Sequence, residues 1–337
     1  MIRCGIIGFG KMGKIRADSI EKSGRGRVDA IYDIHPSPDC SYRMAESPEE
    51  IILSPDIDAL FVCTPNLQIP ELCRNGLAAG KHVFSEKPPG FNTSHVESVC
   101  AAEQDAGDRK LMYGFNHRHH ESIIRMKQIV ESGELGRVLW MRGRYGKEVD
   151  QAFFEGWRAK PELSGGGILL DQGIHMVDLM LHLGGGFDEV SAFVSNLFWK
   201  IEGIEDNVFA IFRNSITGCC ASLHSTMTQW RYLFSLEVFS EGGALVLNGL
   251  KTSSGAYGDE VLSIKRNPTH LHDGRFEHEE QITYHLDTSW QSEINHFFDC
   301  IENDQPVRYG NSNDALTVIR LIDKIYAAAG PLKAIPS

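Results

Sequence analysis

The first third of the chain alternates short apolar runs with segments of helical periodicity. The apolar runs cover residues 2–7, 28–33, 58–63, 82–85 and 111–114, and they are typical of parallel strands that are buried on both faces. Helical segments lie between them. Ser47-Pro48-Glu49-Glu50 is a capping box with proline at the first helical position, and Gly80 closes a helix expected over 71–79. Repeated strand–helix units predict a doubly wound sheet.

The pattern changes after about residue 119. One helix is expected to end at Gly133, and consecutive strands then follow, several with period-two alternation: 138–145, 190–196, 207–212, 219–227, 234–240 and 244–247. Two helices, near 290–302 and 314–329, close the chain. We therefore predict an α/β protein with a doubly wound domain over 1–118. An α+β domain, built on an open and mostly antiparallel sheet, is expected over 119–337.

The length and the composition agree with two globular domains. The chain has 337 residues, and one domain accounts for about 150. With 42% hydrophobic and 23% charged residues, the composition excludes disorder as the main state. The chain has no run of about 18 apolar residues and no secretory signal at its start, so we predict no membrane span and no secretion. Eight scattered cysteines without a C-x-x-C pair indicate reduced thiols and a cytoplasmic location.

The charge of the chain is negative and unevenly placed. The formal net charge is −12; residues 1–118 hold 14 basic against 16 acidic residues, and residues 119–337 hold 19 against 29. Because such a surface repels polyanions, we predict that the partner is neither nucleic acid nor a membrane.

A glycine-rich turn, Gly8-Phe9-Gly10-Lys11-Met12-Gly13, follows the first predicted strand and opens a helix. In this pattern the first two glycines allow a tight turn close to a pyrophosphate, and the third lets the helix pack on the strand. Asp33 ends the second predicted strand 20 residues after Gly13, where a carboxylate accepts hydrogen bonds from ribose hydroxyls and repels a 2′-phosphate. Ile34-His35-Pro36 then offers no arginine for such a phosphate. These features predict NAD binding rather than NADP binding.

Glu86-Lys87-Pro88 follows the strand expected over 82–85. Ligands bind at the carboxyl ends of strands in such sheets. A single lysine is more commonly a solvated surface charge, but Lys87 lies between a strand end and two prolines, so we take it as a candidate site residue. In the second domain Arg142, Arg144 and Lys147 could meet an anionic substrate group, although surface charge is the commoner role.

A helix expected over 167–183 is apolar nearly all round and should be buried. Four polar residues at i, i+4, i+7 and i+11 form one stripe along it: Asp171, His175, Asp178 and His182. Buried carboxylates and imidazoles are costly unless paired, so the stripe needs an explanation. One explanation is a general base, His175, beside carboxylates that orient it, and a second is a metal site, since Asp-x-x-x-His can ligate zinc. The third is a satisfied polar network in the core, which we favour for His182.

Two further groups of histidines look like metal-binding tracts but are irregularly spaced. They are His117, His119 and His120, and His270, His272 and His278. We predict solvated loops at these positions and no bound metal.

Further short motifs follow the glycine turn in a fixed order. They are Thr64-Pro65-Asn66, Ala79-Gly80-Lys81-His82-Val83, Glu86-Lys87-Pro88, Gly114-Phe115-Asn116 with Arg118, Gly133-Glu134-Leu135-Gly136-Arg137-Val138, Trp157-Arg158, and the glycine-rich run 165–175. Over most of the chain this series resembles the glucose–fructose oxidoreductase/inositol dehydrogenase family, also called Gfo/Idh/MocA. One position departs from it. The family often has a histidine three residues after the Asn of Thr-Pro-Asn, and this chain has Ile69 there.

The resemblance implies a Rossmann domain followed by an α+β domain whose open sheet forms subunit contacts. It also implies that Lys87, Asp171 and His175 are the catalytic residues, and that the substrate is a sugar, a cyclitol or a sugar nucleotide. The residues expected to hold NAD are Gly8, Phe9, Gly10, Lys11, Met12, Gly13, Asp33, Ile34, Thr64, Pro65, Asn66, Glu86, Lys87 and Asn116. Those expected to bind the substrate are Lys87, Arg144, Trp157, Arg158, Asp171 and His175.

We therefore expect an NAD(H)-dependent dehydrogenase that transfers a hydride between nicotinamide and a carbinol carbon. His175 would act as general acid and base, Lys87 and Asp171 would assist, and the loop 146–163 would cover the site. Two alternatives stay open: an NAD-dependent glycoside hydrolase of the same fold, and an NAD-bound sensor without turnover. A homodimer or homotetramer is expected, because the second sheet needs a cover on both faces for apolar residues such as Val194, Phe209, Phe212 and Phe239.

Overall fold

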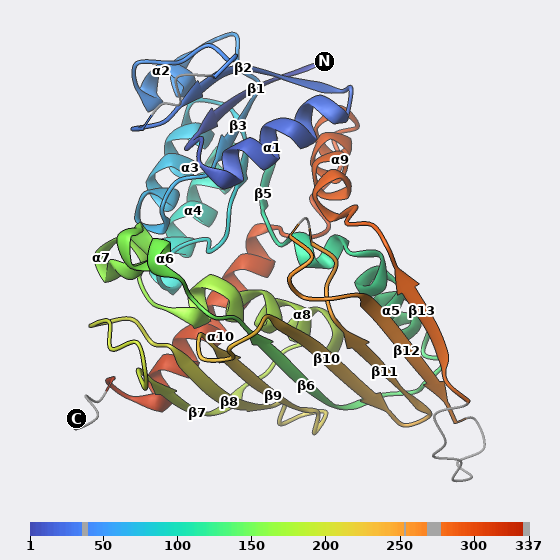
Figure 1. Cartoon of the computed structure of the whole chain (residues 1–337). Coiled ribbons are helices and arrows are strands. Elements are labelled where there is room, and N and C mark those ends of the chain that lie inside the picture. Colours follow the sequence, from blue (N-terminus) through green and yellow to red (C-terminus); the bar gives the residue numbers. More distant parts are fainter. Residues whose placement is uncertain (36–39, 253, 268–277, 333–337) are drawn as a thin grey trace. The chain divides into compact units, whose positions relative to one another are not determined.

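A five-stranded parallel sheet with the order β2-β1-β3-β4-β5 organises the N-terminal part of the chain (Figure 1). The structure is a computed structural model that describes residues 1–35, 40–252, 254–267 and 278–332. All five predicted strands are present: β1 (Ile2–Ile7), β2 (Gly26–Tyr32), β3 (Ala59–Val62), β4 (His82–Ser85) and β5 (Leu111–Tyr113). Nearly every side chain of β1, β3, β4 and β5 is buried, which explains why these strands read as continuous apolar runs.

Helices connect these strands. They are α1 (Lys11–Lys22), α2 (Pro48–Leu53), α3 (Ile69–Ala78) and α4 (Thr93–Asp105), with 3-10 turns η1 (Asn66–Gln68) and η2 (Asn116–His119). Ser47 caps α2 as predicted, because its side chain accepts a hydrogen bond from the Glu50 amide. The reciprocal bond of the capping box is shifted by one residue, since the Glu50 carboxylate accepts from the Glu46 amide. Helix α4 is not predicted by the apolar pattern, because it buries only two residues, Val96 and Val99.

The described chain divides into two units. The N-terminal unit contains Met1–His119 and Thr288–Ile319, and the C-terminal unit contains His120–Asp287 and the residues from Arg320 onward. The division expected from the sequence differs, because it assigns all of 119–337 to the second domain. Helix α9 (Ser289–Glu302) therefore belongs to the N-terminal unit, although it follows most of the C-terminal unit in sequence.

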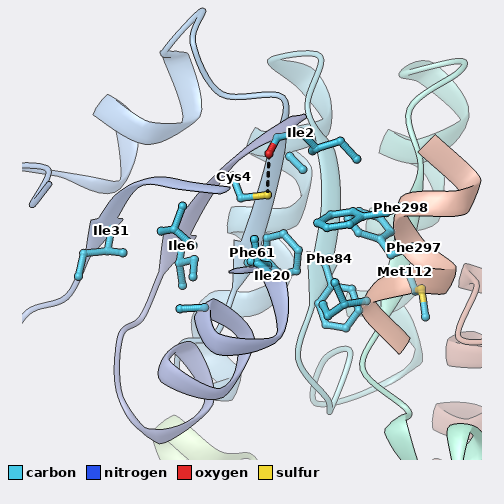
Figure 2. Close-up of a cluster of buried hydrophobic side chains, with 14 residues drawn as sticks. Ile2, Cys4, Ile6, Ile20, Ile31, Phe61, Phe84, Met112, Phe297 and Phe298 are labelled. Carbon is cyan, nitrogen blue, oxygen red and sulfur yellow. Dashed lines mark hydrogen bonds between the residues drawn. The ribbon is translucent and has the colours of Figure 1, made fainter. Parts of the chain in front are cut away.

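The apolar face of α9 explains this difference. Ile294, Phe297 and Phe298 are fully buried in the same core as Phe61 of β3 and Phe84 of β4 (Figure 2). The ring of Phe297 meets the rings of Phe61 and Phe84 edge-on, at centroid distances of 5.8 and 5.5 Å. Burial of these three large apolar side chains stabilises this position of α9 by about 2 kcal/mol each.

An eight-stranded sheet with the order β13-β12-β11-β10-β6-β9-β8-β7 organises the C-terminal unit (Figure 1). Neighbouring strands are antiparallel except for β6 and β9, which run parallel. The strands are β6 (Val138–Gly146), β7 (Glu189–Ser195), β8 (Asn207–Arg213), β9 (Cys220–Thr226), β10 (Leu233–Ser240), β11 (Gly243–Asn248), β12 (Glu260–Arg266) and β13 (Glu280–Tyr284). The predicted strands are all present, but β12 and β13 are additional. Strand β13 lies at the sheet edge with mostly exposed side chains, so it lacks an apolar pattern.

The helices of the C-terminal unit include one that packs on the middle of this sheet. A Cβ added to Gly143 of β6 would come within 2.5 Å of Met176 and Met180, which lie on α8 (Ile174–Gly184). The single regular helix predicted over 167–183 is wrong, because a π-helical turn, η4 (Leu169–Gly173), precedes α8. The remaining helices of this unit are α5 (Glu121–Ser132), α6 (Gln151–Glu155), η3 (Trp157–Ala159) and α7 (Pro161–Ser164). Helix α10 (Ser312–Ala329) begins in the N-terminal unit and belongs to the C-terminal unit from Arg320 onward. Within the described residues, no helix combines the length and the apolarity needed to cross a lipid bilayer.

Candidate active site

The glycine turn after β1 has the close backbone contacts that its three glycines predict. Gly8 has φ +90°, and a Cβ there would lie 2.5 Å from the carbonyl oxygen of Cys63. A Cβ on Gly13 would lie 2.2 Å from the carbonyl oxygen of Gly8, so helix and turn pack closely. Gly10 has no neighbour within 4 Å of such a position, and no side chain caps α1. The first amides of this 12-residue helix therefore have no side-chain cap, and a helix N-terminus of this kind suits an anionic group.

Asp33 at the end of β2 is tied to the glycine turn. One oxygen of its carboxylate accepts a hydrogen bond from the Phe9 amide at 2.5 Å, and the other accepts from the His35 amide at 2.8 Å. These bonds hold the carboxylate half-buried beside the turn. The sequence predicts that Asp33 binds a ribose. Its hydrogen bond from the Phe9 amide shows that it also holds the glycine turn in place.

The other residues expected to hold the cofactor follow β3, β4 and β5. Among the described residues, the Thr64 hydroxyl oxygen is buried without a hydrogen-bond partner, beside the point where Gly8 approaches the chain. Asn116 is buried and donates to the Ser289 hydroxyl at 3.2 Å. A buried hydroxyl without a partner costs about 1–3 kcal/mol, so a ligand that bonds to Thr64 would relieve this cost. An open glycine turn and this hydroxyl at the carboxyl ends of parallel strands fit a dinucleotide.

A buried ion cluster, which the sequence does not predict, lies beside Lys87. Arg16 of α1 donates through Nε to Glu86 at 2.7 Å and through a terminal nitrogen to Glu293 of α9 at 2.6 Å, and the exposed fractions of the three side chains are 0%, 7% and 0%. Its guanidinium also lies over the rings of Phe84 and Trp290, with Cζ 4.3 and 4.9 Å from the centroids. Burial acts to lower the pKa of Arg16, but the two carboxylates outweigh it and raise the pKa above its ordinary value.

Lys87 directly follows Glu86 and is half-buried. The peptide bond between Lys87 and Pro88 is cis. The backbone amide of Glu86 donates to the carbonyl of Val62 at the end of β3. The buried ion cluster and this backbone bond therefore fix the residue that precedes Lys87.

A second ion cluster, formed by Asp171, Lys147 and Arg158, lies in the C-terminal unit. Lys147 Nζ donates to one oxygen of Asp171 at 2.5 Å, and Arg158 Nε donates to the other at 3.1 Å. The side chains are 16%, 13% and 41% exposed, so water reaches this Asp171 cluster. Arg158 also lies over the ring of Trp157, with Cζ 4.4 Å from the centroid. The sequence names Asp171, Trp157 and Arg158 as site residues, but it does not predict these pairings.

The turn that carries Asp171 is anchored by a buried carboxylate. Glu205 accepts hydrogen bonds from the amides of Gly167 and Leu169, at 2.7 and 2.9 Å, and from the hydroxyl of Tyr326 at 2.9 Å. A Cβ on Gly167 would lie 2.0 Å from the Glu205 carbonyl oxygen, so only glycine fits there. Burial raises the pKa of Glu205. Close backbone approach thus requires glycine at position 167, whereas Gly165 has a φ of +75°, which also favours glycine.

The predicted polar stripe is only partly regular. His175 and Asp178 are buried on α8, whereas Asp171 and His182 are half-buried. Residues that lie above one another are five apart in a π turn rather than four, so Asp171 is displaced from the row that an α-helix would give. The backbone carbonyl of His182 accepts a hydrogen bond from Lys127 Nζ at 2.6 Å, and the structural role of its imidazole stays a prediction.

Two other expectations for the second domain need correction. The loop 146–163 is not an open loop, because it contains the short helices α6, η3 and α7. Arg144 is exposed and donates to Ser235, while its neighbours Gly143 and Tyr145 are buried. Since side chains alternate along a strand, Arg144 lies on the sheet face away from α8. The structure therefore does not bring it to the Asp171 cluster.

The histidines considered as metal tracts are not in solvated loops, which corrects that prediction. His117, His119 and His120 are buried, and His120 Nδ1 lies 2.9 Å from the carboxylate of Glu260. His278 is exposed, and His270 and His272 lie outside the described residues. In the part of the chain that the structure describes, no group of three or more His, Cys, Asp or Glu side chains could hold a metal ion.

The parallel sheet, its glycine turn and the residues after its strands define an NAD-binding oxidoreductase class, and comparison with known families identifies which one. Residues 2–115 match the model of an oxidoreductase family with an NAD-binding Rossmann fold, and residues 123–246 match the Gfo/Idh/MocA C-terminal domain. The chain belongs to the Gfo/Idh/MocA family. The predicted family, fold class and NAD cofactor are therefore confirmed.

The individual relatives and solved structures compared below share less than a third of their aligned residues with this chain. The chain is 27% identical to the myo-inositol 2-dehydrogenase of Thermotoga maritima over 77% of this chain and 79% of that protein. It is 31% identical to the D-glucoside 3-dehydrogenase of Escherichia coli over 46% and 44%. The solved levoglucosan dehydrogenase in complex with NADH shares the fold, with a TM-score of 0.84 and 20% identity over 97% of this chain and 96% of that one. The aldose-aldose oxidoreductase from Caulobacter crescentus gives 0.81 and 23% over 97% of each.

Proposed function

We propose that this protein is an NAD(H)-dependent dehydrogenase acting on a carbinol carbon of a sugar, cyclitol or sugar nucleotide. The observation that carries the proposal is the Asp171 cluster. In this family, which binds NAD, the partly exposed carboxylate of Asp171 is held between two cations, Lys147 and Arg158. The buried His175 follows Asp171 by four residues in the same helical segment. The names of the relatives, an inositol dehydrogenase and a glucoside dehydrogenase among them, support the same substrate class.

Three residues would carry the proton chemistry. His175 would take the proton of the substrate hydroxyl as a general base, and Asp171 would orient the imidazole or the substrate. Lys87 would hold and polarise the reacting oxygen with its ammonium group. The glycine turn, Asp33 and Thr64 would hold NAD, which when bound supplies the acceptor for a hydride.

A sugar panel tests the proposal. Purified protein is mixed with NAD and with single sugars, sugar nucleotides, cyclitols and glycosides, and absorbance at the NADH band is followed. We expect free NADH to accumulate with at least one compound. Release of an aglycone without net NADH would instead favour an NAD-dependent glycoside hydrolase, and binding without turnover would favour a sensor.

We also propose that a second copy of the chain covers the open face of the large sheet. Phe209 and Ile211 of β8 are exposed, while Val208, Ala210 and Phe212 alternate with them and are buried. Phe193 of β7 pairs in register with Phe209 and is exposed on the same face, together with Trp140 of β6. Phe212 therefore faces the covered side of the sheet and does not belong to this surface.

An exposed apolar sheet face of this kind is typical of a subunit contact. Light scattering at micromolar concentration should show a dimer or a tetramer. Ile211→Asp should shift the protein toward the monomer, whereas a monomeric wild type would contradict this part of the proposal.

A further inference from the structure

A cluster of four aromatic side chains lies in the C-terminal unit, and nothing in the proposed chemistry uses it. This ring cluster consists of Phe154 of α6, Phe198 and Trp199 after β7, and Trp230 after β9. Phe154 contacts Trp199 at 5.4 Å between centroids, Phe198 contacts Trp199 and Trp230 at 4.9 Å each, and Trp199 and Trp230 are 5.8 Å apart. Phe198 and Trp230 are 55% and 56% exposed, so two large rings of the cluster face solvent.

The ring cluster and the Asp171 cluster lie at the same end of the strands of the eight-stranded sheet. Strand β6 ends there at Gly146 and β9 at Thr226, which pair in register. A chain of contacts joins the two clusters. Lys147, which binds Asp171, lies with Nζ 5.5 Å from the ring centroid of Phe153, and Phe153 is 6.0 Å from Phe154. A series of contacts through Phe153 therefore links the ring cluster to Lys147 in the Asp171 cluster.

The loop that carries Phe198 and Trp199 is held firmly by the protein. Asp206, which is buried, accepts hydrogen bonds from three successive amides, those of Leu197, Phe198 and Trp199, at 2.8, 2.7 and 3.0 Å. The indole nitrogen of Trp199 donates to the carbonyl of Met227 at 3.0 Å. This loop and the one carrying Trp230 are thus bonded to each other, and the ring cluster is prepared in advance of any ligand.

Trp230 adopts a conformation that bulky residues rarely take. Its φ is +55°, a left-handed value that favours glycine or asparagine and costs energy for tryptophan. None of the four contacts in the ring cluster is a parallel stack, since the interplanar angles are 59°, 87°, 82° and 59°, and Phe198 and Trp230 are more than half exposed. On the open sheet, by contrast, Trp140 and Phe239 stack face to face at 8°. The ring cluster can therefore still stack another ring.

From this arrangement we infer that the ring cluster is a subsite for a second ring of the substrate, so that the enzyme acts on glycosides rather than on free monosaccharides. The inference rests on the proposed function, since the first ring would bind at the Asp171 cluster. The matching ligand is polar at one end and has a flat apolar ring face at the other. That face belongs either to a second pyranose or to an aromatic aglycone. A protein partner fits less well, because two exposed rings are far short of the roughly 800 Å² that each side of a stable interface buries.

Binding of matched glycosides tests the inference without turnover. Titration calorimetry on the protein with saturating NADH compares methyl and phenyl D-glucopyranosides, in both anomers, with cellobiose and maltose. We expect at least one phenyl glucoside or disaccharide to bind about tenfold more tightly than the methyl glucoside of the same anomer, as stacking of one ring predicts. If only the phenyl compounds gain, the ring is an aromatic aglycone; if the disaccharides gain, it is a second sugar. Equal affinities, or no binding of any probe, would overturn the inference.

Variants locate the effect. Trp230→Asn suits the positive φ and should remove the gain, and Phe198→Ala should do the same without altering a strained position. Trp140→Ala is the control, because Trp140 lies near the start of β6, away from Gly146, and should keep the gain. Retention of the full gain in both cluster variants would refute the subsite. Dissociation of an oligomer by Trp230→Asn would assign the rings to a subunit contact and would also refute it.

The two proposals fail in different ways. If the panel yields no NADH but the phenyl advantage depends on Trp230, the dehydrogenase proposal fails and the ring subsite stands. If NADH forms but the advantage is absent, the ring subsite fails alone.

Discussion

The two units each contain a cluster of carboxylates and cations, and the clusters differ in charge balance and in access to water. In the N-terminal unit one cation, Arg16, serves two carboxylates, and its guanidinium is completely buried. In the C-terminal unit one carboxylate, Asp171, serves two cations, and all three side chains are partly exposed. A fully buried charge pair cannot exchange its partner without a large desolvation cost, whereas a half-exposed one can. The first cluster is therefore suited to hold structure, and the second is suited to meet a ligand.

The largest effect on activity is expected at the buried helix beside the Asp171 cluster. His175→Asn should keep the fold and NAD binding, because a side chain of similar size fills the space. It should lower turnover by roughly 10²–10⁴, the usual contribution of a positioned acid–base group. Lys87→Met should be similarly damaging, since the ammonium is lost while the stem still packs. Initial rates with the substrate found in the panel measure both.

His182→Asn is the matched control for His175→Asn. His182 lies further along the same helix and its side chain is half-buried, so loss of the imidazole should lower stability and leave the turnover of the folded fraction nearly unchanged. If the two histidine variants exchange these outcomes, the assignment of the base is wrong even though the family is right.

The largest effect on stability is expected at Arg16. Arg16→Met would leave the Glu86 and Glu293 carboxylates buried without their cation, at a cost of about 3–5 kcal/mol in the free energy of unfolding. Urea denaturation followed by circular dichroism measures this. Arg27→Met is the control, because Arg27 pairs with Asp29 on the surface and its loss should leave the urea midpoint near that of the wild type.

Further substitutions at the same cluster test why Arg16→Met lowers stability. If uncompensated charge causes the loss, the triple variant Arg16→Met, Glu86→Gln, Glu293→Gln should regain part of the stability that Arg16→Met removes. A triple variant less stable than Arg16→Met would show that packing around the guanidinium, and not charge, governs this cluster.

A smaller effect is expected at Asp33, whose side chain is half-buried. Asp33→Ala should weaken NAD binding by roughly 1.5–3 kcal/mol, the range for a hydrogen bond to a charged group, and should narrow the preference over NADP. Fluorescence titration with NADH and NADPH measures both affinities. A wild type that already prefers NADPH would contradict the interpretation of the turn after β2.

The smallest effect is a pH dependence of stability in the N-terminal unit. Burial, helped by the nearby charges of Arg109 and Lys110, lowers the pKa of His82 to about 4, and its Nδ1 accepts from the Lys110 amide. In the unfolded chain a histidine has a pKa of ~6.5, so between about pH 6.5 and 4 the unfolded state binds a proton that the folded state does not. Stability should therefore fall as the pH falls through this window.

Because His82 is partly exposed, solvent screening limits the effect to about 1–2 kcal/mol. Urea midpoints at pH 7 and pH 4.5 measure it. His82→Gln should have a shallower slope between these values, and an unchanged slope would assign the dependence to other groups.

Local patterns of the sequence are sufficient for much of the molecule. The glycine turn, the Ser47 cap and the strands of both sheets except β12 and β13 follow from the apolar periodicity and from turn residues. The reason is that burial of a strand or a helix face imposes a short-range pattern on neighbouring residues. Lys87, Asp171 and His175 could be selected as candidates in the same way, because each stands in a recognisable run.

Only the tertiary structure decided which residues distant in sequence contact these elements. Arg16 meets Glu293 across 277 positions of sequence, and Gly167 meets Glu205 across 38, so no local pattern marks either pair. The π turn at Leu169–Gly173 and the assignment of α9 to the N-terminal unit likewise depend on packing against distant residues. A periodic pattern records which side of an element is buried. It does not record which distant charge or ring will be its neighbour, because that depends on how the elements pack together in three dimensions.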